Sequence, residues 1–243
     1  MATKKPAVKK AAPKKAETFE VIFGRLTEQA QAYKVKAGTE IMTLRGPMRG
    51  LLSCERVLLN FMQRLSGIAT AARAYADALA GAPTRLLDTR KTPPGHRALD
   101  KYAVAIGGGT NHRMGLYDMV LIKDNHAEAC GSVRAAVEKV HAQYAGKYTV
   151  EAEVRTLAEL ESLLDAPVDI ILLDNMDDAL LKQAIAMARQ RAPRLKLEAS
   201  GNMDLARAAR IRDFGLDFIS VGALTHSVKA LDISLDIVRE AHG

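Results

Sequence analysis

Basic side chains gather at the ends of short apolar segments in two stretches of the sequence, LDTRK and NHRMGLYDMVLIKDNH. The basic set comprises Arg90, Lys91, His112, Arg113, Lys123 and His126. The planar guanidinium group of arginine matches two carboxylate or phosphate oxygens at once, and the lysine ammonium group adds a compact point charge. The set therefore predicts a site for a substrate that carries several negative charges.

Carboxylates lie at the ends of the same kind of apolar segment. The acidic set comprises Asp88, Asp124, Glu151, Glu153 and Asp174. Magnesium takes oxygen ligands and is commonly held by one or two carboxylates together with substrate phosphates. Glu153 and Asp174, which we expect on adjacent strands, are the candidate magnesium ligands. Because Glu151 and Glu153 alternate with apolar neighbours, the alternative remains that one or both face a helix or a partner.

Small residues with free backbone amides follow the last two expected strands, in EASG and SVGA. Ser200, Gly201 and Gly222 each precede a helical pattern, and such turns bind phosphate through backbone amides and the start of the helix. The GGG at 107–109 is not followed by Gly-Lys-Ser/Thr, so we interpret it as the exit of a helix. A zinc site is not expected, because His112 and His126 lack the spacing of helical metal ligands.

Strands and helices alternate along most of the chain. Strands are expected at 84–88, 118–122, 148–154, 169–174, 195–199 and 217–222. Helices are expected at 97–106, 132–143, 156–164, 177–191 and 204–215, with a final helix through 231–241. This alternation predicts a parallel sheet wrapped by helices.

Two architectures compete for such a sheet, an open doubly wound sheet and a barrel. A dinucleotide-binding open sheet would carry Gly-x-Gly-x-x-Gly after its first strand, where this chain has TRKTPPG. Most of the expected strands end instead in a polar or glycine cluster, and in barrels such ends meet at one mouth. A single charged residue at a strand end is usually only solvated. The six ends together favour an irregular or incompletely closed barrel.

The segment before the first strand contains a long helical pattern. Apolar residues recur at three- and four-residue steps across 53–81, with Ser53 as the expected N-cap, Gly81 as the stop and a break near Ser66-Gly67. Residues 17–46 predict a helix and a small pair of strands around Gly38.

The composition limits the class of protein. The chain has 243 residues, 48% of them hydrophobic, which is enough for one substantial core. Six lysines in KKPAVKKAAPKK account for nearly all of the net charge of +7, and residues 1–16 are expected to be a disordered arm. Two distant cysteines fit a reducing cytoplasm, and no apolar segment is long enough to cross a membrane.

Six motifs occur in an order that resembles one enzyme family. ERVLLNFMQRLSGIAT, LDTRKTPPGHRALDKYAV, GGGTNHRMGLYDMVLIKDNH, LLDNM, EASG and ISVGALTHS look like successive motifs of quinolinate phosphoribosyltransferase, from about Ala37 onward. The resemblance implies an α/β fold, an irregular and incomplete TIM-like α/β barrel with a truncated N-terminal α/β sandwich domain. It also implies a homodimer or higher homo-oligomer with sites between subunits.

The resemblance further implies a reaction and roles for single residues. The family transfers phosphoribosyl from phosphoribosyl pyrophosphate to quinolinate with decarboxylation, giving nicotinate mononucleotide, pyrophosphate and CO2 for NAD biosynthesis. Arg56 looks like the arginine that reaches the neighbouring subunit, and Lys91 like a group between the two substrates. The quinolinate carboxylates would be held by Arg90, His112, Arg113 and Lys123. Glu153 and Asp174 would lie near the ribose and Mg²⁺, while Ser200, Gly201 and Gly222 would bind the 5'-phosphate.

The expected organisation has three parts and differs from the family at the N-terminus. We expect a lysine-rich arm at 1–16, a remnant of the sandwich domain at 17–70 and the catalytic barrel at 71–243. Only about the last third of the sandwich domain is retained, so its sheet should expose an edge and apolar surface unless a partner covers it. The alternative function is a non-catalytic truncated barrel that binds phosphoribosyl ligands or partners, tethered by its basic arm. Nucleic acid is an unlikely partner except nonspecifically through that arm.

Overall fold

The structure is a computed structural model that describes residues 37–237. The chain divides into two compact units, Met1–Ile41 and Met42–Gly243. In the first unit only residues 37–41 are described, and they form no helix or strand. The strand pair expected around Gly38 is therefore wrong for residues 37–46, where Gly38 lies in a turn at a φ of +79°. The arm at 1–16 and the helix expected before Gly38 fall outside the described residues.

One six-stranded parallel sheet forms the centre of the second unit, with the strand order β1-β6-β5-β4-β3-β2. The strands are β1 (Arg85–Leu87), β2 (Val120–Ile122), β3 (Val150–Val154), β4 (Ile170–Asp174), β5 (Lys196–Ser200) and β6 (Phe218–Ser220). β1 and β2 are the two edges and do not pair with each other, although Thr110 forms an isolated parallel bridge to Leu87. The predicted strands and the incomplete barrel are confirmed.

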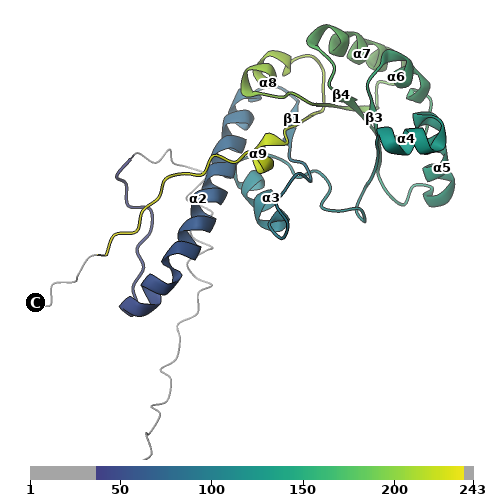
Figure 1. Ribbon diagram of the computed structural model, residues 1–243. Coiled ribbons are helices and arrows are strands. Elements are labelled where there is room, and N and C mark those ends of the chain that lie inside the picture. The colour runs from purple at the N-terminus through teal and green to yellow at the C-terminus, as the bar shows by residue number, and fades with distance from the viewer. Residues whose placement is uncertain (1–36, 238–243) are drawn as a thin grey trace, which may run out of the picture. The chain divides into compact units, whose positions relative to one another are not determined.

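The helices that follow the strands cover the outer side of the sheet. They are α3 (Arg97–Ile106), α4 (Asp124–Cys130), α5 (Val133–Tyr144), α6 (Leu157–Leu163), α7 (Asp178–Arg191), α8 (Leu205–Ile211) and α9 (Ala223–His226). Figure 1 shows α4 to α8 following one another around the outside of the curved sheet. The short helices α4 and α9 were not among the predicted ones, and the four residues of α9 are too few to show a helical period.

Local hydrogen bonds explain where several of these helices begin. The Thr156 side chain accepts a hydrogen bond from the Glu159 amide, and the Glu159 carboxylate accepts one from the Thr156 amide. Ser132, Asp177 and Asp204 cap α5, α7 and α8 in the same way, each accepting from an amide in the first turn. An N-cap of this kind stabilises a helix by about 1 kcal/mol. The caps fix where each helix starts and therefore how long the preceding strand-end loop is.

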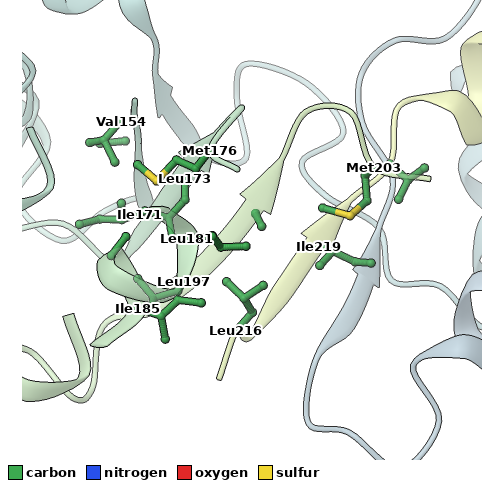
Figure 2. Close-up of a cluster of buried hydrophobic side chains, with 14 of the residues drawn as sticks. Val154, Ile171, Leu173, Met176, Leu181, Ile185, Leu197, Met203, Leu216 and Ile219 are labelled. Atoms are coloured by element: carbon green, nitrogen blue, oxygen red, sulfur yellow. The ribbon is translucent and has the colours of Figure 1, made fainter. Parts of the chain in front are cut away.

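The main hydrophobic core lies between the sheet and its helices. Figure 2 shows part of it, with Val154, Leu173 and Leu197 of the strands packed near Leu181 and Ile185 of α7. A second and smaller cluster consists of Leu87, Ile170 and Phe218 from three strands. Successive residues of a strand point to opposite faces. The alternate residues of β3 and β5 that avoid the main core therefore point into the barrel.

The long helix α2 (Met48–Ala78) precedes the barrel and is continuous. It begins after Pro47, so the expected N-cap at Ser53 is wrong, and the Ser53 hydroxyl donates to the Arg49 carbonyl inside the helix. The break expected at Gly67 is also wrong. A Cβ at Gly67 would collide with the Lys229 carbonyl, so glycine serves close packing there.

The C-terminal segment lies along α2 instead of forming the expected helix. Residues 231–237 contain no helix, and residues 238–241 fall outside the described part of the chain. The Leu231 amide donates to the Gln63 carbonyl, and the Gln63 side chain donates to the Ile233 carbonyl. These contacts hold the backbone in a non-helical path. Between residues 37 and 237, every helix is too short or too polar to span a bilayer.

Candidate active site

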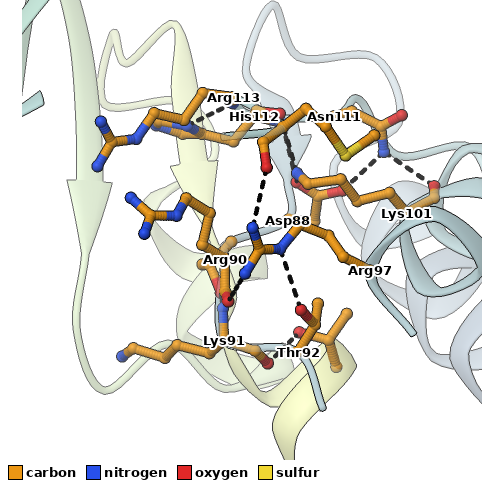
Figure 3. Close-up of polar contacts among 12 residues, drawn as sticks. Asp88, Arg90, Lys91, Thr92, Arg97, Lys101, Asn111, His112 and Arg113 are labelled. Carbon is orange, nitrogen blue, oxygen red and sulfur yellow. Dashed lines mark hydrogen bonds and ion pairs between the residues drawn. The ribbon is translucent and has the colours of Figure 1, made fainter. Parts of the chain in front are cut away.

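The carboxyl ends of the strands bring most of the predicted residues to one mouth. Figure 3 shows Arg90, Lys91 and Arg113 extending their charged groups toward the same side. We call these three residues the basic arc. Lys91 also lies over the end of β6, because a Cβ added to Gly222 would lie 3.1 Å from its Cδ atom. The basic arc and one of the predicted phosphate-binding turns are therefore adjacent.

The two guanidinium groups of the basic arc have few partners. The Arg90 Nε atom is buried without a hydrogen-bond partner, and Arg113 donates to the Met119 carbonyl at 3.2 Å. Among residues 37–237, neither side chain forms an ion pair. Burial, followed by the charge of Arg90, lowers the pKa of Arg113. Two neighbouring cations that lack an ion-pair partner favour the binding of an anion between them.

A buried ion pair holds the chain beneath the basic arc. Lys101 of α3 donates to Asp88 at the end of β1, and both side chains are at least 99% buried. The Asn111 side chain donates to the second Asp88 oxygen at 2.6 Å and to the Lys101 carbonyl at 2.9 Å (Figure 3). The pair also binds the main chain of His112, whose amide donates to Asp88 and whose carbonyl accepts from Lys101.

Arg97 joins the two loops that carry the arginines. Its guanidinium donates to the Thr92 hydroxyl, to the Met114 carbonyl and, at 3.5 Å, to the Arg90 carbonyl. Figure 3 shows this side chain between the two loops. Arg97 therefore fixes the spacing of Arg90 and Arg113 through main-chain contacts.

The carboxylates Glu153 and Asp174, which we call the acidic arc, already contact cations. Lys123 lies 3.3 Å from Glu153, and Arg155 contacts Glu153, Asp174 and Asp124 at 3.1, 3.4 and 3.1 Å. One guanidinium group thus reaches both members of the acidic arc. Their spacing suits a shared cation, and Mg²⁺ with its waters is held by one or two such carboxylates. The acidic arc therefore fits a magnesium ion, provided that the half-exposed Arg155 gives way.

A second pair of carboxyl groups lies deeper, below the mouth. Glu151 of β3 is fully buried and Glu198 of β5 is 1% exposed, and their polar neighbours are each other, the His112 ring and Ser220. Burial raises the pKa of Glu151 to about 7. Burial and the charge of Glu151 raise the pKa of Glu198 to about 8. The two buried groups therefore resist carrying two negative charges at once.

His112 lies beside these carboxyl groups. Its Nε2 atom is 2.9 Å from Glu151 and 3.7 Å from Glu198, and its Nδ1 atom accepts the Arg113 amide at 2.7 Å. Burial lowers its pKa, which favours the neutral ring. The ligand atoms of His112, Glu151 and Glu198 lie within 4.8 Å of one another, a grouping that could hold a metal ion. The spacing of the histidines in the sequence gave no sign of this cluster, because its three members come from different elements.

The small residues predicted to bind phosphate lie at the ends of β5 and β6. Ser200 is in register with Asp174, so this turn adjoins the acidic arc. Gly201 has a φ of +86°, and a Cβ there would collide with the Asn175 side chain. Glycine is therefore required at the turn, and its backbone remains accessible to a ligand.

Two of the basic residues lie apart from this arrangement. Arg56 is exposed on α2, where it forms no ion pair within residues 37–237, and the structure does not bring it to the other groups of its own chain. His126 accepts the Lys123 amide and so caps α4.

Sequence reasoning missed Lys101, Arg97, Arg155 and Glu198. Lys101 lies within a helical pattern, where an exposed face is the usual expectation. A signal did exist for Glu198, because it is the one acidic residue in the apolar segment LKLEA and alternates with Ser200. Alternation places the two on the same face of β5.

Comparisons with known proteins agree with this geometry. The chain matches the model of the quinolinate phosphoribosyl transferase C-terminal domain over residues 68–236, and that of the N-terminal domain over 28–66. A nicotinate-nucleotide pyrophosphorylase [carboxylating] of Mycobacterium leprae is 46% identical over 204 residues, covering 84% of this chain and 72% of the relative. The probable enzyme of the same name from Synechocystis is 42% identical over 232 residues, covering 93% and 78%.

Solved structures give the same result. NadC from Streptococcus pyogenes superposes with a TM-score of 0.71 at 46% identity, covering 77% of this chain and 65% of that one. The nicotinate-nucleotide pyrophosphorylase from Francisella tularensis gives a TM-score of 0.72 at 44% identity, with the same coverage. The chain thus spans about two thirds of these structures and somewhat more of the curated relatives above. The family models, the relatives and the arrangement of the barrel together show that this chain belongs to the quinolinate phosphoribosyltransferase family.

Proposed function

We propose that this chain transfers the phosphoribosyl group of phosphoribosyl pyrophosphate to quinolinate and decarboxylates the product. The main support is the pair of guanidinium groups of Arg90 and Arg113, which extend toward the same side and have no ion-pair partner among residues 37–237. Quinolinate is a planar dicarboxylate, and planar arginine groups bind carboxylates two oxygens at a time. The products are nicotinate mononucleotide, pyrophosphate and CO2.

In this proposal the basic arc and Lys123 hold the quinolinate carboxylates and fix the ring. The Lys123 side chain is half exposed and lies 3.3 Å from Glu153. Lys91 lies between the ring and the donor, which agrees with its position above Gly222. Fixing both reactants in this way removes most of the entropic cost of bringing them together. His112, predicted among the carboxylate-binding groups, would line the same site next to Arg113.

The acidic arc and the phosphate-binding turns hold the donor. Glu153 and Asp174 would bind magnesium, which neutralises charge on the departing pyrophosphate when it is bound. The same carboxylates would stabilise positive charge at the anomeric carbon. Ser200, Gly201 and Gly222 would bind the 5'-phosphate through backbone amides. The proximity of Ser200 to Asp174 in the sheet register supports a single donor site.

The reaction then needs no covalent intermediate with the protein. The pyridine nitrogen donates its electron pair to the anomeric carbon, and the bond to pyrophosphate breaks with its electrons on the leaving oxygen. The bond between the neighbouring ring carbon and its carboxylate then breaks, its electrons stay on that carbon next to the positive ring nitrogen, and CO2 leaves. A proton from solvent completes the ring. The basic arc positions the ring during both steps.

We also propose that the protein acts as a homodimer or higher homo-oligomer in the cytoplasm. Arg56 on α2 would enter the site of the neighbouring subunit, which agrees with its exposure and lack of an ion pair in the described chain. Exposed Leu52, Val57 and Phe61 on the same helix would be covered by that subunit. The free thiols of Cys54 and Cys130 suit a reducing compartment.

Purified full-length protein with quinolinate, phosphoribosyl pyrophosphate and Mg²⁺ tests the proposal. Nicotinate mononucleotide and CO2 should form in equal amounts, and omission of any one component should stop both. Nicotinate in place of quinolinate is the matched control for the second carboxylate. Failure to form the nucleotide with all components present would refute the proposed activity.

A further inference from the structure

We propose that Glu151 and Glu198 are positioning residues for quinolinate, because they hold the His112 ring and through it the main chain that carries Arg113. This inference rests on the proposed function. It assigns a task to two buried carboxyl groups that neither the magnesium site nor the phosphate turns use. Neither residue lies in the set predicted from the sequence to bind substrate or metal.

The first step of the inference is the main chain of residue 112. Its amide donates to Asp88 at 2.9 Å, and its carbonyl accepts from Lys101 at 2.9 Å. Both partners belong to the buried ion pair at the end of β1. The backbone at His112 is therefore fixed from the β1 and α3 side of the barrel.

The second step concerns the His112 ring, both of whose nitrogens have a partner within the protein. Nδ1 accepts the Arg113 amide at 2.7 Å, so the proton of the neutral ring belongs on Nε2. That atom faces the two carboxyl groups at 2.9 and 3.7 Å. Both ring nitrogens therefore have a partner within the protein, and the ring links the buried carboxyl groups to the Arg113 amide.

The third step concerns the residues that surround the two carboxyl groups. By register, Glu151 is beside Ile170, and Glu198 is beside Phe218, two members of the smaller hydrophobic cluster. Within residues 37–237, His112 is the only basic side chain within ion-pair distance of either buried carboxyl group. Burial of a carboxyl group costs stability unless its contacts offset the lost solvation. Stability therefore does not account for these residues, whereas their contact with His112 does.

The fourth step is the link from His112 to the substrate. The Arg113 amide is tied to the ring, and the Arg113 side chain extends into the mouth beside Arg90 (Figure 3). A shift of about 1 Å in a substrate-binding group can reduce a rate by roughly a hundredfold. A loose His112 ring would therefore weaken quinolinate binding while leaving the donor site intact.

Glu198→Met tests the inference, with Glu198→Gln as the conservative variant. The methionine variant should raise the KM for quinolinate roughly tenfold or more, leave the KM for phosphoribosyl pyrophosphate unchanged, and keep or raise the Tm. The glutamine variant should restore quinolinate KM to within about threefold, because its amide can still contact the ring and Glu151. Phe218→Leu is the matched control, since it disturbs the barrel interior without contacting His112.

A double-mutant cycle separates positioning of Arg113 from other effects. In an Arg113→Ala background, Glu198→Met should add less than about a twofold further rise in quinolinate KM. Full additivity would overturn the inference, as would equal changes in the two KM values. Stoichiometric divalent metal in purified wild-type protein that is lost in Glu198→Gln would also overturn it, because the cluster would then be a metal site. An inactive wild type would instead refute the proposed function.

Discussion

The basic arc and the acidic arc lie at the same mouth but differ in how far the protein neutralises them. Arg90 and Arg113 have no carboxylate within ion-pair distance in the described chain, whereas Glu153 and Asp174 share Arg155. The positive charges of the basic arc therefore repel one another until an anion binds between them. The acidic arc is already balanced and must exchange one cation for another. The difference suggests that quinolinate binds to a preformed site, while the donor and its metal displace a protein side chain.

The largest effect should come from removing one guanidinium group of the basic arc. Arg113→Ala or Arg90→Ala each removes up to two hydrogen bonds to a charged group, worth about 1.5–3 kcal/mol each. We expect kcat/KM for quinolinate to fall by roughly 100- to 1000-fold. Steady-state kinetics would measure this fall in kcat/KM. Arg134→Ala is the control, since Arg134 on α5 pairs with Glu138 and Asp165 and not with the basic arc. A loss below tenfold would mean that the basic arc is not the quinolinate site.

The next effect concerns the acidic arc and should appear as a metal requirement. Glu153→Gln or Asp174→Asn should raise the Mg²⁺ concentration for half-maximal activity by roughly tenfold or more. The KM for quinolinate should stay unchanged, because the ring binds to the other arc. Titration of activity with Mg²⁺ checks this, and the exposed Asp165→Asn serves as the control. An unchanged Mg²⁺ requirement would contradict the assignment of the metal.

The sequence predicted the fold better than it predicted the supports of the site. All six strands were located, because each is a short apolar segment between helical patterns and must be buried. The prediction of a final helix was wrong for residues 231–237. The amphipathic pattern at 231–241 does not reveal that Gln63 binds the backbone at Leu231 and Ile233. A tertiary contact of this kind overrides local propensity.

The same distinction holds within the site. Residues at strand ends, such as Arg90 and Asp174, were found because chain topology alone brings those ends together. Lys101 was missed because its burial depends on a pairing with Asp88 thirteen positions away. The contact between His112 and Glu198 joins elements still more distant in sequence. Hydrophobic periodicity does not reveal such pairs, so the positions of the strand-end residues were predictable and those of their buried supports were not.

A smaller effect should appear in stability against pH. The pKa of Glu198 is raised from 4.5 to about 8, so between those values the folded protein retains a proton that the unfolded chain has released. Stability must therefore fall as pH rises through this window. Relative to Glu198→Gln, the wild-type Tm should fall by roughly 5 °C between pH 6 and 9. Parallel thermal melts of the two proteins give the measurement, and parallel curves would contradict the raised pKa.

The smallest effect should come from the cation that already occupies the acidic arc. Exposed ion pairs contribute little, so Arg155→Ala should change metal affinity by only about two- to fivefold. The direction is the informative part: the Mg²⁺ concentration for half-maximal activity should fall, because the metal no longer competes with a guanidinium group. Arg191→Ala, which removes an equally exposed pair with Glu161, should leave it unchanged. If Arg155→Ala instead raises the Mg²⁺ requirement, Arg155 assists donor binding, and the acidic arc does not exchange one cation for another.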